Sequence, residues 1–283
     1  MPGTLFVVAT PIGNLEDLTF RALRTLREVD LIAAEDTRRT SKLLAHYEIR
    51  KPLVSLHEHN EDLEGERLVA KLTSGSNVAL VSDAGTPTIA DPGFRLVASA
   101  RAAGIAIVPI PGVSAVITAL SASGVPADQF SFLGFPPSGG LARDRWFERL
   151  ATETNTVVFY ESPHRIERTM SDVSELLVNR HTVICRELTK LNEELVIWDN
   201  KTVVRPQGEF VVVVGPAIQA TGHEPEADSV AVFVGQVIEK LSLGEDAAMR
   251  LAATHFAIPA IKVRKLLKKG RILLKRSSDN HLP

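Results

Sequence analysis

The sequence predicts an α/β fold with two α/β domains in tandem and a small helical domain at the C-terminal end. In residues 1–134, short runs rich in β-branched residues alternate with stretches of helical period. The same alternation returns after a segment rich in glycine and proline. Most of the short runs are apolar throughout, which is typical of parallel strands that are covered on both faces. The length of 283 residues is enough for roughly two domains of ordinary size.

The first domain is expected over residues 1–134. Its predicted strands lie at residues 5–9, 31–34, 52–56, 78–82, 105–110 and 130–133. Its predicted helices lie between them, at residues 19–28, 39–46, 61–73, 94–103 and 113–122. This order of elements is typical of an open, mostly parallel sheet.

A linker is predicted at residues 134–140, because glycine and proline there break both strand and helix. The second domain is expected over residues 141–221, with strands at 156–160, 182–186, 195–198 and 210–215 and a helix at 164–178. A polar loop follows at residues 216–228. The helical domain, residues 229–283, is expected to contain helices at 229–241, 245–255 and 259–269, with Pro259 in a first turn, where proline is tolerated.

Composition excludes several classes of protein. Apolar residues make up 45% and charged residues 23%, so the chain is neither collagen-like nor largely disordered. No apolar run approaches the roughly 18 residues that span a bilayer, and the first ten residues lack the basic region of a secretory signal. The protein is therefore expected to be soluble and cytoplasmic. Cys185 is the only cysteine, which excludes an internal disulfide and a thiolate metal cage.

The net charge of −2 hides an uneven distribution along the chain. Residues 262–283 contain eight basic residues and one acidic residue, a net charge of +7, whereas residues 1–261 carry a net charge of −9. A basic end on an acidic body indicates an anionic macromolecule as partner, because Lys and Arg displace the counterions condensed on phosphates. The alternative is a solvated helix end, which a run of charge by itself favours.

Polar strings follow the predicted strands, where an open parallel sheet collects its functional residues. Thr10-Pro-Ile-Gly-Asn14 is a rigid turn in which glycine permits close backbone approach. Ala34-Glu-Asp-Thr-Arg38 begins a helix, and capping that helix needs only one of its side chains. Ser82-Asp-Ala-Gly-Thr-Pro87, with Asp91-Pro-Gly93, forms a stiff loop against which a flat ligand can lie. Pro111-Gly-Val-Ser-Ala115 opens a helix whose free N–H groups suit a polar ligand edge.

Two similar strings lie in the second domain, Tyr160-Glu-Ser-Pro-His-Arg165 and Arg186-Glu-Leu-Thr-Lys190. The conservative interpretation is structural ion pairing, Glu161 with Arg165 and Glu187 with Lys190. With His57-Glu-His-Asn60 after the third predicted strand, these strings make seven polar strand ends, which together favour a functional edge.

Missing motifs limit the ligand class. His57 and His59 are two residues apart, but no third ligand is spaced near them, so no metal site is predicted. No two glycines are two positions apart, which excludes the G-x-G-x-x-G dinucleotide fingerprint. A phosphate-binding loop with its lysine and a G-x-S-x-G nucleophile elbow are also absent. A small ligand held by backbone groups and mixed charges remains.

Taken in order, these strings resemble the signature set of the ribosomal small-subunit RNA (cytidine-2′-O)-methyltransferases, a family within the tetrapyrrole methylase superfamily. The resemblance runs from about residue 5 to 215. It implies two α/β domains with S-adenosylmethionine between them, usually in a homodimer. It also implies methylation of a cytidine ribose in the decoding region of 16S rRNA, with 16S rRNA or the 30S subunit as partner. One departure from the family is a shorter segment between Glu194 and Gly208.

The resemblance also implies which residues form the site. From the first domain, the cofactor-binding residues would be Pro11, Asp83, Gly85, Thr86, Ile89, Ser114 and Ala115. From the second domain they would be Tyr160, Leu188 and Glu209.

Ribose methylation requires a group that takes the hydroxyl proton while oxygen, methyl group and sulfur are in line. The candidate bases are Asp36, Glu35, Glu161 and Lys190, and the sequence does not rank them. The candidate phosphate clamps are Arg38, Arg165 and Arg186, because arginine binds phosphate in a bidentate manner. Lys265, Lys268 and Lys269 would attract RNA independently of its sequence.

Two other functions remain open from the sequence. One keeps the cofactor but has a tetrapyrrole as the methyl acceptor, although the basic C-terminal end argues against it. The other is a non-enzymatic regulator that binds nucleic acid through its last helices and senses a metabolite in the α/β body.

Overall fold

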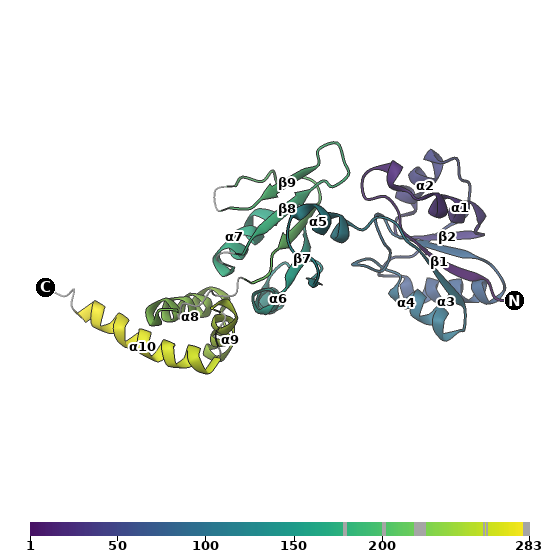
Figure 1. Ribbon diagram of the computed structural model, residues 1–283. Helices are drawn as coiled ribbons and strands as arrows, with labels where there is room; N and C mark the ends of the chain where they lie inside the picture. The colour runs from purple at the N-terminus through teal and green to yellow at the C-terminus, as the bar shows by residue number, and fades with distance from the viewer. Residues whose placement is uncertain (178–179, 200–201, 218–224, 257, 259, 280–283) are drawn as a thin grey trace. The chain divides into compact units, whose positions relative to one another are not determined.

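The computed structural model describes residues 1–283 except 178–179, 200–201, 218–224, 257, 259 and 280–283, and its elements are labelled in Figure 1. The chain divides into two compact units. Unit 1 comprises Met1–Thr118 and Glu187–Glu193, and unit 2 comprises Ala119–Arg186 and Glu194–Pro283. Each unit contains a five-stranded sheet covered by helices. The predicted α/β class, with helices at the C-terminal end, is confirmed.

Unit 1 is built on a parallel sheet with the strand order β3-β2-β4-β1-β5. In chain order its elements are β1 (Thr4–Val8), η1 (Leu15–Asp17), α1 (Phe20–Glu28), β2 (Leu31–Ala34), α2 (Thr37–His46), β3 (Leu53–Ser55), α3 (Glu61–Thr73), β4 (Val78–Val81), α4 (Phe94–Ala102) and β5 (Ala106–Ile110). Helix α5 (Ala115–Ser123) runs across the division between the units.

The two faces of this sheet are covered by different helices, as Figure 1 shows. Successive residues of each strand point to opposite faces of the sheet. In β4, Leu80 packs with α3 and α4, whereas Ala79 and Val81 pack with α1 and α2. Burying a leucine-sized side chain contributes about 1.5 to 3 kcal/mol, so both layers stabilise the sheet. The continuous apolar strands follow directly from this arrangement.

The connections of the first sheet diverge on either side of β4. The chain leaves β1 and β2 toward the β3 edge, but it leaves β4 toward β5 at the opposite edge. Loops that leave neighbouring strands in opposite directions open a crevice beyond the carboxyl ends of those strands. The loop after β4 therefore lies at the position where ligands of such sheets bind.

Unit 2 is built on a mixed sheet with the order β6-β7-β10-β8-β9, in which β6 and β7 are parallel and the other pairs are antiparallel. In chain order its elements are β6 (Phe130–Phe132), α6 (Gly140–Thr152), β7 (Thr156–Glu161), α7 (Ile166–Leu176), β8 (Thr182–Arg186), β9 (Glu194–Ile197), β10 (Phe210–Val214), α8 (Ala227–Leu241), α9 (Glu245–His255) and α10 (Ala260–Asp279).

The last three helices share one apolar core with the second sheet and with α6. Helix α10 packs closely on α8, because a Cβ at Gly270 would overlap the carbonyl of Ala227. Val230 and Val234 of α8 and Val263 of α10 are fully buried in this contact region. The prediction of three domains with limits at 134, 141, 221 and 229 stays a prediction. Among the described residues, no helix is both long enough and apolar enough to cross a bilayer.

Three predictions about the elements need correction. The strand at residues 130–133 was expected in the first sheet, but β6 pairs with β7 in the second sheet. Long-range pairing of this kind leaves no signal in the local pattern of three residues. Helix α6 was not predicted, because the neighbouring glycine and proline residues outweighed the buried Trp146, Phe147 and Leu150. Helix α10 extends ten residues beyond the predicted residue 269. The predictions for residue 178, residues 218–224 and Pro259 lie outside the described residues.

Candidate active site

The turns after β1 and β4 are joined through their backbones. Thr10 N donates to the Gly85 carbonyl at 2.8 Å, and Gly85 N donates to the Thr10 carbonyl at 3.0 Å. Gly85 has a φ of +76°, which a residue with a Cβ adopts only under strain. The Thr86 hydroxyl donates to the Val113 carbonyl at 3.2 Å, which attaches the turn after β5. Six predicted cofactor-binding residues of unit 1 thus lie along one edge of neighbouring strands: Pro11, Asp83, Gly85, Thr86, Ser114 and Ala115.

The rest of the loop after β4 is held in an unusual backbone conformation. Thr88 and Ala90 have φ values of +71° and +63°, in the left-handed region that β-branched residues rarely occupy. The Glu61 carboxylate fixes the end of the loop, since it accepts hydrogen bonds from Gly93 N at 2.9 Å and Arg95 N at 2.8 Å. Ile89, the seventh predicted cofactor residue of unit 1, remains 45% exposed between the two strained positions. Strain of this kind persists where surrounding structure fixes it, and it concentrates at binding sites.

Carboxylates gather where β2 and β4 end. Asp36 N donates to Asp83 Oδ1 at 3.0 Å, and Asp83 N lies 3.4 Å from Glu35 Oε2. Arg39 forms an ion pair with Asp83 at 3.3 Å. Asp91 has no predicted role, but its electrostatic interactions with Glu35 and Asp83 add it to this group. We call Glu35, Asp36, Asp83 and Asp91 the carboxylate cluster.

The pKa values within the carboxylate cluster separate in opposite directions. Burial, with a smaller contribution from the charge of Asp83, raises the pKa of Glu35. Burial, together with the charges of Glu35 and Asp83, raises the pKa of Asp91 to about 6. Hydrogen bonds from the Arg38 side chain and backbone instead lower the pKa of Asp36 to about 2. Carboxyl groups with opposed pKa shifts in one crevice are typical of acid–base sites.

The loop Glu187–Glu193 belongs to unit 1 by its contacts, although it connects two strands of unit 2. It lies on Gly13, where a Cβ would overlap the Lys190 side chain and lie 2.9 Å from the Thr189 hydroxyl. Glycine is therefore required at position 13 because the loop Glu187–Glu193 packs directly against the backbone there. The predicted ion pair between Lys190 Nζ and Glu187 Oε1 is present at 2.8 Å, and the same loop contains Leu188.

Glu161, a candidate base of unit 2, is held by structural hydrogen bonds. Its side chain is fully buried and accepts from Ser162 N at 2.7 Å and from the Thr169 hydroxyl at 2.6 Å. The predicted ion pair with Arg165 is present at 2.8 Å. The carboxylate thus has a donor on each oxygen, and its contacts tie β7 to α7.

The other predicted residues of unit 2 lie at the ends of its strands. Arg186 is buried, donates to the Gln207 carbonyl at 2.6 Å, and lies 3.3 Å from Glu194. The Tyr160 ring has Phe132 and Phe135 at centroid distances of 4.9 and 5.3 Å. Glu209 directly precedes β10. A cofactor site that draws on Tyr160, Glu209 and unit 1 together stays a prediction.

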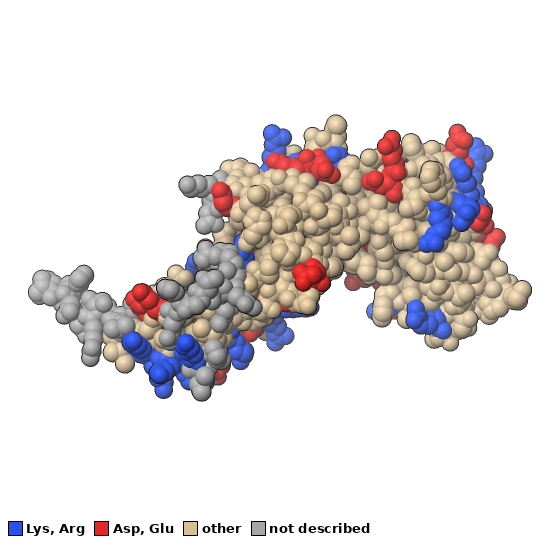
Figure 2. Space-filling view, in the orientation of Figure 1, with Lys and Arg blue, Asp and Glu red and all other residues tan. Residues whose placement is uncertain are grey.

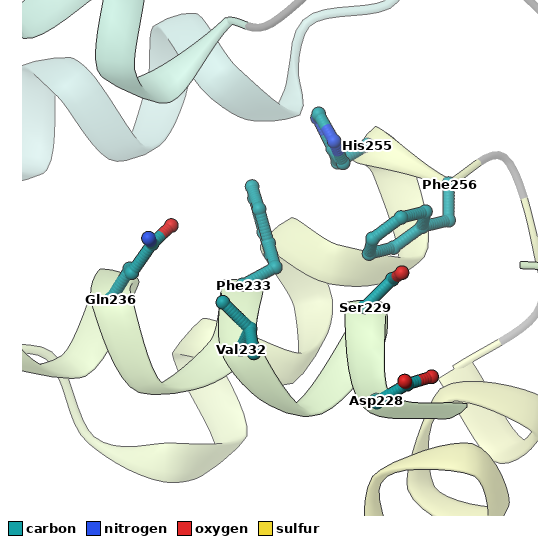
Figure 3. Close-up of a pocket in the computed structure, with 7 residues that line it drawn as sticks. All are labelled: Asp228, Ser229, Val232, Phe233, Gln236, His255 and Phe256. Atoms are coloured by element: carbon teal, nitrogen blue, oxygen red, sulfur yellow. The ribbon is translucent and has the colours of Figure 1, made fainter. Parts of the chain in front are cut away.

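A separate hollow of about 400 Å³ lies between α8 and α9, as Figure 3 shows. Phe233 and His255 stack at its wall with a centroid distance of 4.3 Å and an interplanar angle of 12°. Burial lowers the pKa of His255, which favours the neutral form of the imidazole. The residues that line this hollow are Asp228, Ser229, Val232, Phe233, Gln236, His255 and Phe256. The predicted site residues are not among them.

The described residues do not form a metal centre. Among them, no group of three or more His, Cys, Asp or Glu side chains is arranged to hold a metal ion. The rings of His57 and His59 lie 6.0 Å apart between centroids.

Known proteins resemble this chain over most of its length. The model of the tetrapyrrole (corrin/porphyrin) methylases matches residues 4–203. A protein of Xylella fastidiosa named ribosomal RNA small subunit methyltransferase I is 50% identical over 279 residues, which are 95% of this chain and 99% of that protein. Proteins of the same name from Escherichia coli O157:H7 and Halalkalibacterium halodurans are 48% and 50% identical, over 94% and 81% of this chain and 94% and 80% of their own lengths.

Solved structures share the fold at low identity. Diphthine synthase aligns over 93% of this chain and 99% of its own, with a TM-score of 0.58 and 14% identity. The methyltransferase CobJ aligns over 79% of this chain and 97% of its own, with a TM-score of 0.58 and 20% identity. These likenesses concern the fold alone. The sequence matches and the fold together establish that the chain belongs to the tetrapyrrole methylases and, within them, to the family of ribosomal RNA small subunit methyltransferases I.

Proposed function

We propose that the protein transfers a methyl group from S-adenosylmethionine to the 2′-hydroxyl of a cytidine in the decoding region of 16S rRNA, as a homodimer acting on the rRNA or the 30S subunit. The observation that carries the proposal is 50% identity over 95% of the chain with a protein named ribosomal RNA small subunit methyltransferase I. The cytidine, its 2′-oxygen and the dimer rest on the resemblance of the strand-end strings to that family.

The strand-end residues of unit 1 fit the chemistry of S-adenosylmethionine. Its sulfonium and ammonium groups are cationic, and the carboxylate cluster supplies negative charge at the edge of β2 and β4. Its carboxylate suits the free N–H groups at the start of α5, next to Ser114 and Ala115. Gly85, with its positive φ and no Cβ, leaves room for a ligand against the backbone. Pro11, Asp83, Thr86, Ile89, Leu188, Tyr160 and Glu209 would complete the binding site.

Glu35 is the best supported of the four candidate bases. The Asp36 carboxylate is occupied by Arg38 and its pKa lies near 2, so it accepts a proton poorly. Glu161 is buried among three donors, and Lys190 donates to Glu187. Burial raises the pKa of Glu35 toward the working pH, which is the direction that a general base requires.

Proton transfer to Glu35 completes the reaction without a metal ion. When bound, S-adenosylmethionine supplies an electrophilic methyl group. As the ribose oxygen forms its bond to that carbon and the carbon–sulfur bond breaks, Glu35 would take the hydroxyl proton. Burial and the negative charge of Asp83 would keep the pKa of Glu35 high.

Contacts to RNA phosphates would come from both units. Arg38 is exposed beside the proposed base, whereas Arg165 and Arg186 are largely committed to structural partners. Lys265, Lys268 and Lys269 are exposed on α10 and, within the described part of the chain, form no ion pair. These lysines would add attraction that is independent of sequence and sensitive to salt.

The proposal is tested by three measurements. Calorimetry should detect S-adenosylmethionine binding, and mass spectrometry of nucleosides should detect a 2′-O-methylated cytidine when the protein is added to 30S subunits from a strain that lacks it. In the same assay, Glu35→Gln should lower the methylation rate by about 10²- to 10⁴-fold while cofactor affinity changes little. Glu66→Gln on the exposed face of α3 is the matched control and should act like the parent protein. Absence of cofactor binding, or methylation of a tetrapyrrole and not of rRNA, would refute the proposal.

A further inference from the structure

The two helix layers of the first sheet differ in charge. Helices α1 and α2 together contain six basic residues and one acidic residue, Glu28. Helices α3 and α4 contain four basic and four acidic residues. The basic residues of the first layer are Arg21, Arg24, Arg27, Arg38, Arg39 and Lys42. One face of the sheet is therefore covered by a positively charged layer and the other by a layer without net charge.

The cations of the α1–α2 layer are exposed to solvent. Arg24 and Lys42 are exposed and, among the described residues, form no ion pair. Arg21 and Arg27 donate to the carbonyls of Pro109 and Tyr47, at 3.3 and 3.2 Å, and neither has a carboxylate partner in the part of the chain that the structure describes. Figure 2 shows Lys and Arg side chains over the region that Figure 1 labels α1 and α2.

The layer begins beside the proposed base. Helix α2 starts at Thr37, two residues after Glu35. Arg38 and Lys42 are four positions apart and therefore lie on one face of α2, about 6 Å apart along its axis. The Arg27–Tyr47 hydrogen bond and a shared apolar core hold α1 next to α2. The positive charge is thus continuous with the edge that holds the carboxylate cluster.

An exposed aromatic ring lies among these cations. Phe20, the first residue of α1, is 92% exposed. Its spacing from Arg24 and Arg27 places all three on one face of the helix. Folding does not account for a phenylalanine in this position, since it buries almost none of the ring. Aromatic rings interleaved with basic residues are typical of surfaces that bind single-stranded nucleic acid, where bases stack on the rings.

We propose that the exposed face of α1 and α2 binds a single-stranded segment of the substrate RNA, with Phe20 stacking on a base and Arg24, Arg27 and Lys42 contacting phosphates. This inference rests on the proposed function, because it presumes that RNA is the substrate. It adds a second RNA-binding surface to the lysines of α10 and gives a role to residues outside the strand-end strings. RNA is favoured over an acidic protein because cations outnumber apolar groups on this face.

Paired charge variants test the inference. The double variant Arg24→Gln with Lys42→Gln should weaken binding of 30S subunits and reduce the slope of log K against log salt concentration by about 1.4, since each lost phosphate contact of a single strand contributes about 0.7. The control Lys71→Gln with Arg101→Gln removes the same charge from exposed positions of the α3–α4 layer and should leave both quantities unchanged.

The aromatic ring is tested separately. Phe20→Leu should weaken binding by about 5- to 150-fold, because loss of one stacked base costs on the order of 1 to 3 kcal/mol. Phe20→Tyr should bind like the parent protein, because its ring still stacks. Equal effects of both substitutions on binding would argue against stacking. Far-UV circular dichroism and cofactor calorimetry, unchanged in all variants, separate lost RNA contacts from lost folding.

Two further outcomes would overturn the inference. One is an equal loss of binding in the control variant of α3 and α4. That result would mean that RNA binding depends on the total charge of the protein and not on the α1–α2 face. The other is a photocrosslinker at position 42 that labels a ribosomal protein and not 16S rRNA. If the parent protein methylates rRNA and the α1–α2 variants still bind and methylate normally, only this inference fails. If the parent protein neither binds the cofactor nor methylates rRNA, the proposed function fails first.

Discussion

Glu35 and Glu161 lie at the ends of strands in the two sheets and have opposite surroundings. Glu35 follows β2 in the all-parallel sheet, is half-buried, and lies near two other carboxylates. Glu161 ends β7 in the mixed sheet, is fully buried, and accepts from Ser162 N, the Thr169 hydroxyl and Arg165. Burial and like charge raise the pKa of Glu35, whereas each carboxylate oxygen of Glu161 accepts a hydrogen bond from a neighbouring donor.

This difference shows why a polar string at a strand end is not sufficient to predict a catalytic group. In the mixed sheet, the string after β7 connects the strand to the helix that follows it. In the parallel sheet, the loops after β1, β2 and β4 meet and leave carboxylates without enough cations to neutralise them. A structural strand end differs from a candidate catalytic one in whether the fold supplies an opposite charge or a hydrogen-bond donor for each carboxylate.

The largest expected effect is on folding and comes from Glu161. Glu161→Ala should reduce the free energy of unfolding of unit 2 by about 3 kcal/mol, because it leaves Arg165, Thr169 and Ser162 N without their acceptor. Both tryptophans, Trp146 and Trp198, lie in unit 2, so urea denaturation followed by tryptophan fluorescence measures this unit.

Glu35→Ala provides the matched comparison at the end of the strand in unit 1. Its effect on the free energy of unfolding should stay within about 0.5 kcal/mol in denaturation followed by circular dichroism, as is usual when no buried partner is lost. Its effect on methylation should be large. Similar losses of stability in the two variants would show that the contrast between the two glutamates is wrong.

The order and type of most elements could be predicted from the sequence, because they depend on local pattern. Helix α3 and strand β2 have the predicted bounds, and the ends of the other strands of the first sheet differ from prediction by at most one residue. The position of β6 could not be predicted, since it depends on hydrogen bonds to β7, more than twenty residues away. The antiparallel pairing of β10 with β7 and β8 could not be predicted for the same reason, because it also depends on hydrogen bonds between distant segments.

Much of the candidate site could also be predicted, because its polar residues directly follow strands that the sequence predicts. The ranking of Glu35 above Asp36 as the base could not be predicted, since it depends on the Arg38 side chain, which donates to the Asp36 carboxylate. Asp91 could have been selected from its place in an Asp-Pro-Gly sequence within the polar loop after β4. Its raised pKa depends on burial, which the sequence does not contain.

A smaller effect on stability should come from Asp91. Its pKa is about 6 in the folded protein and near 3.8 when unfolded, so the folded state holds the extra proton between these values and loses stability as the pH rises from about 4 to 6. Asp91→Asn removes this cost. Because the group is partly exposed, the gain in the free energy of unfolding should be about 1 kcal/mol above pH 6 and near zero at pH 4.

The difference between Asp91→Asn and the parent protein, measured by urea denaturation at several pH values, checks this expectation. Glu66→Gln, an exposed acid on α3, serves as the control and should give a difference that is flat with pH. A flat difference for Asp91→Asn as well would mean that the carboxylate cluster does not destabilise the ionised form. The proposed difference between the surroundings of the carboxylate cluster and those of Glu161 would then be wrong.

The smallest effect should come from His255, a half-buried group of unit 2 for which burial is the one cause of a pKa shift among the described residues. Burial lowers its pKa below the ordinary value of 6.5, so the unfolded chain takes up the proton first as the pH falls. The free energy of unfolding of unit 2 should therefore decrease as the pH falls below about 6.5. His255→Phe keeps a ring stacked on Phe233 and should remove this part of the pH dependence. Tryptophan fluorescence at pH 7 and pH 5 measures the change, and an unaltered pH dependence in the variant would assign the proton uptake to other groups.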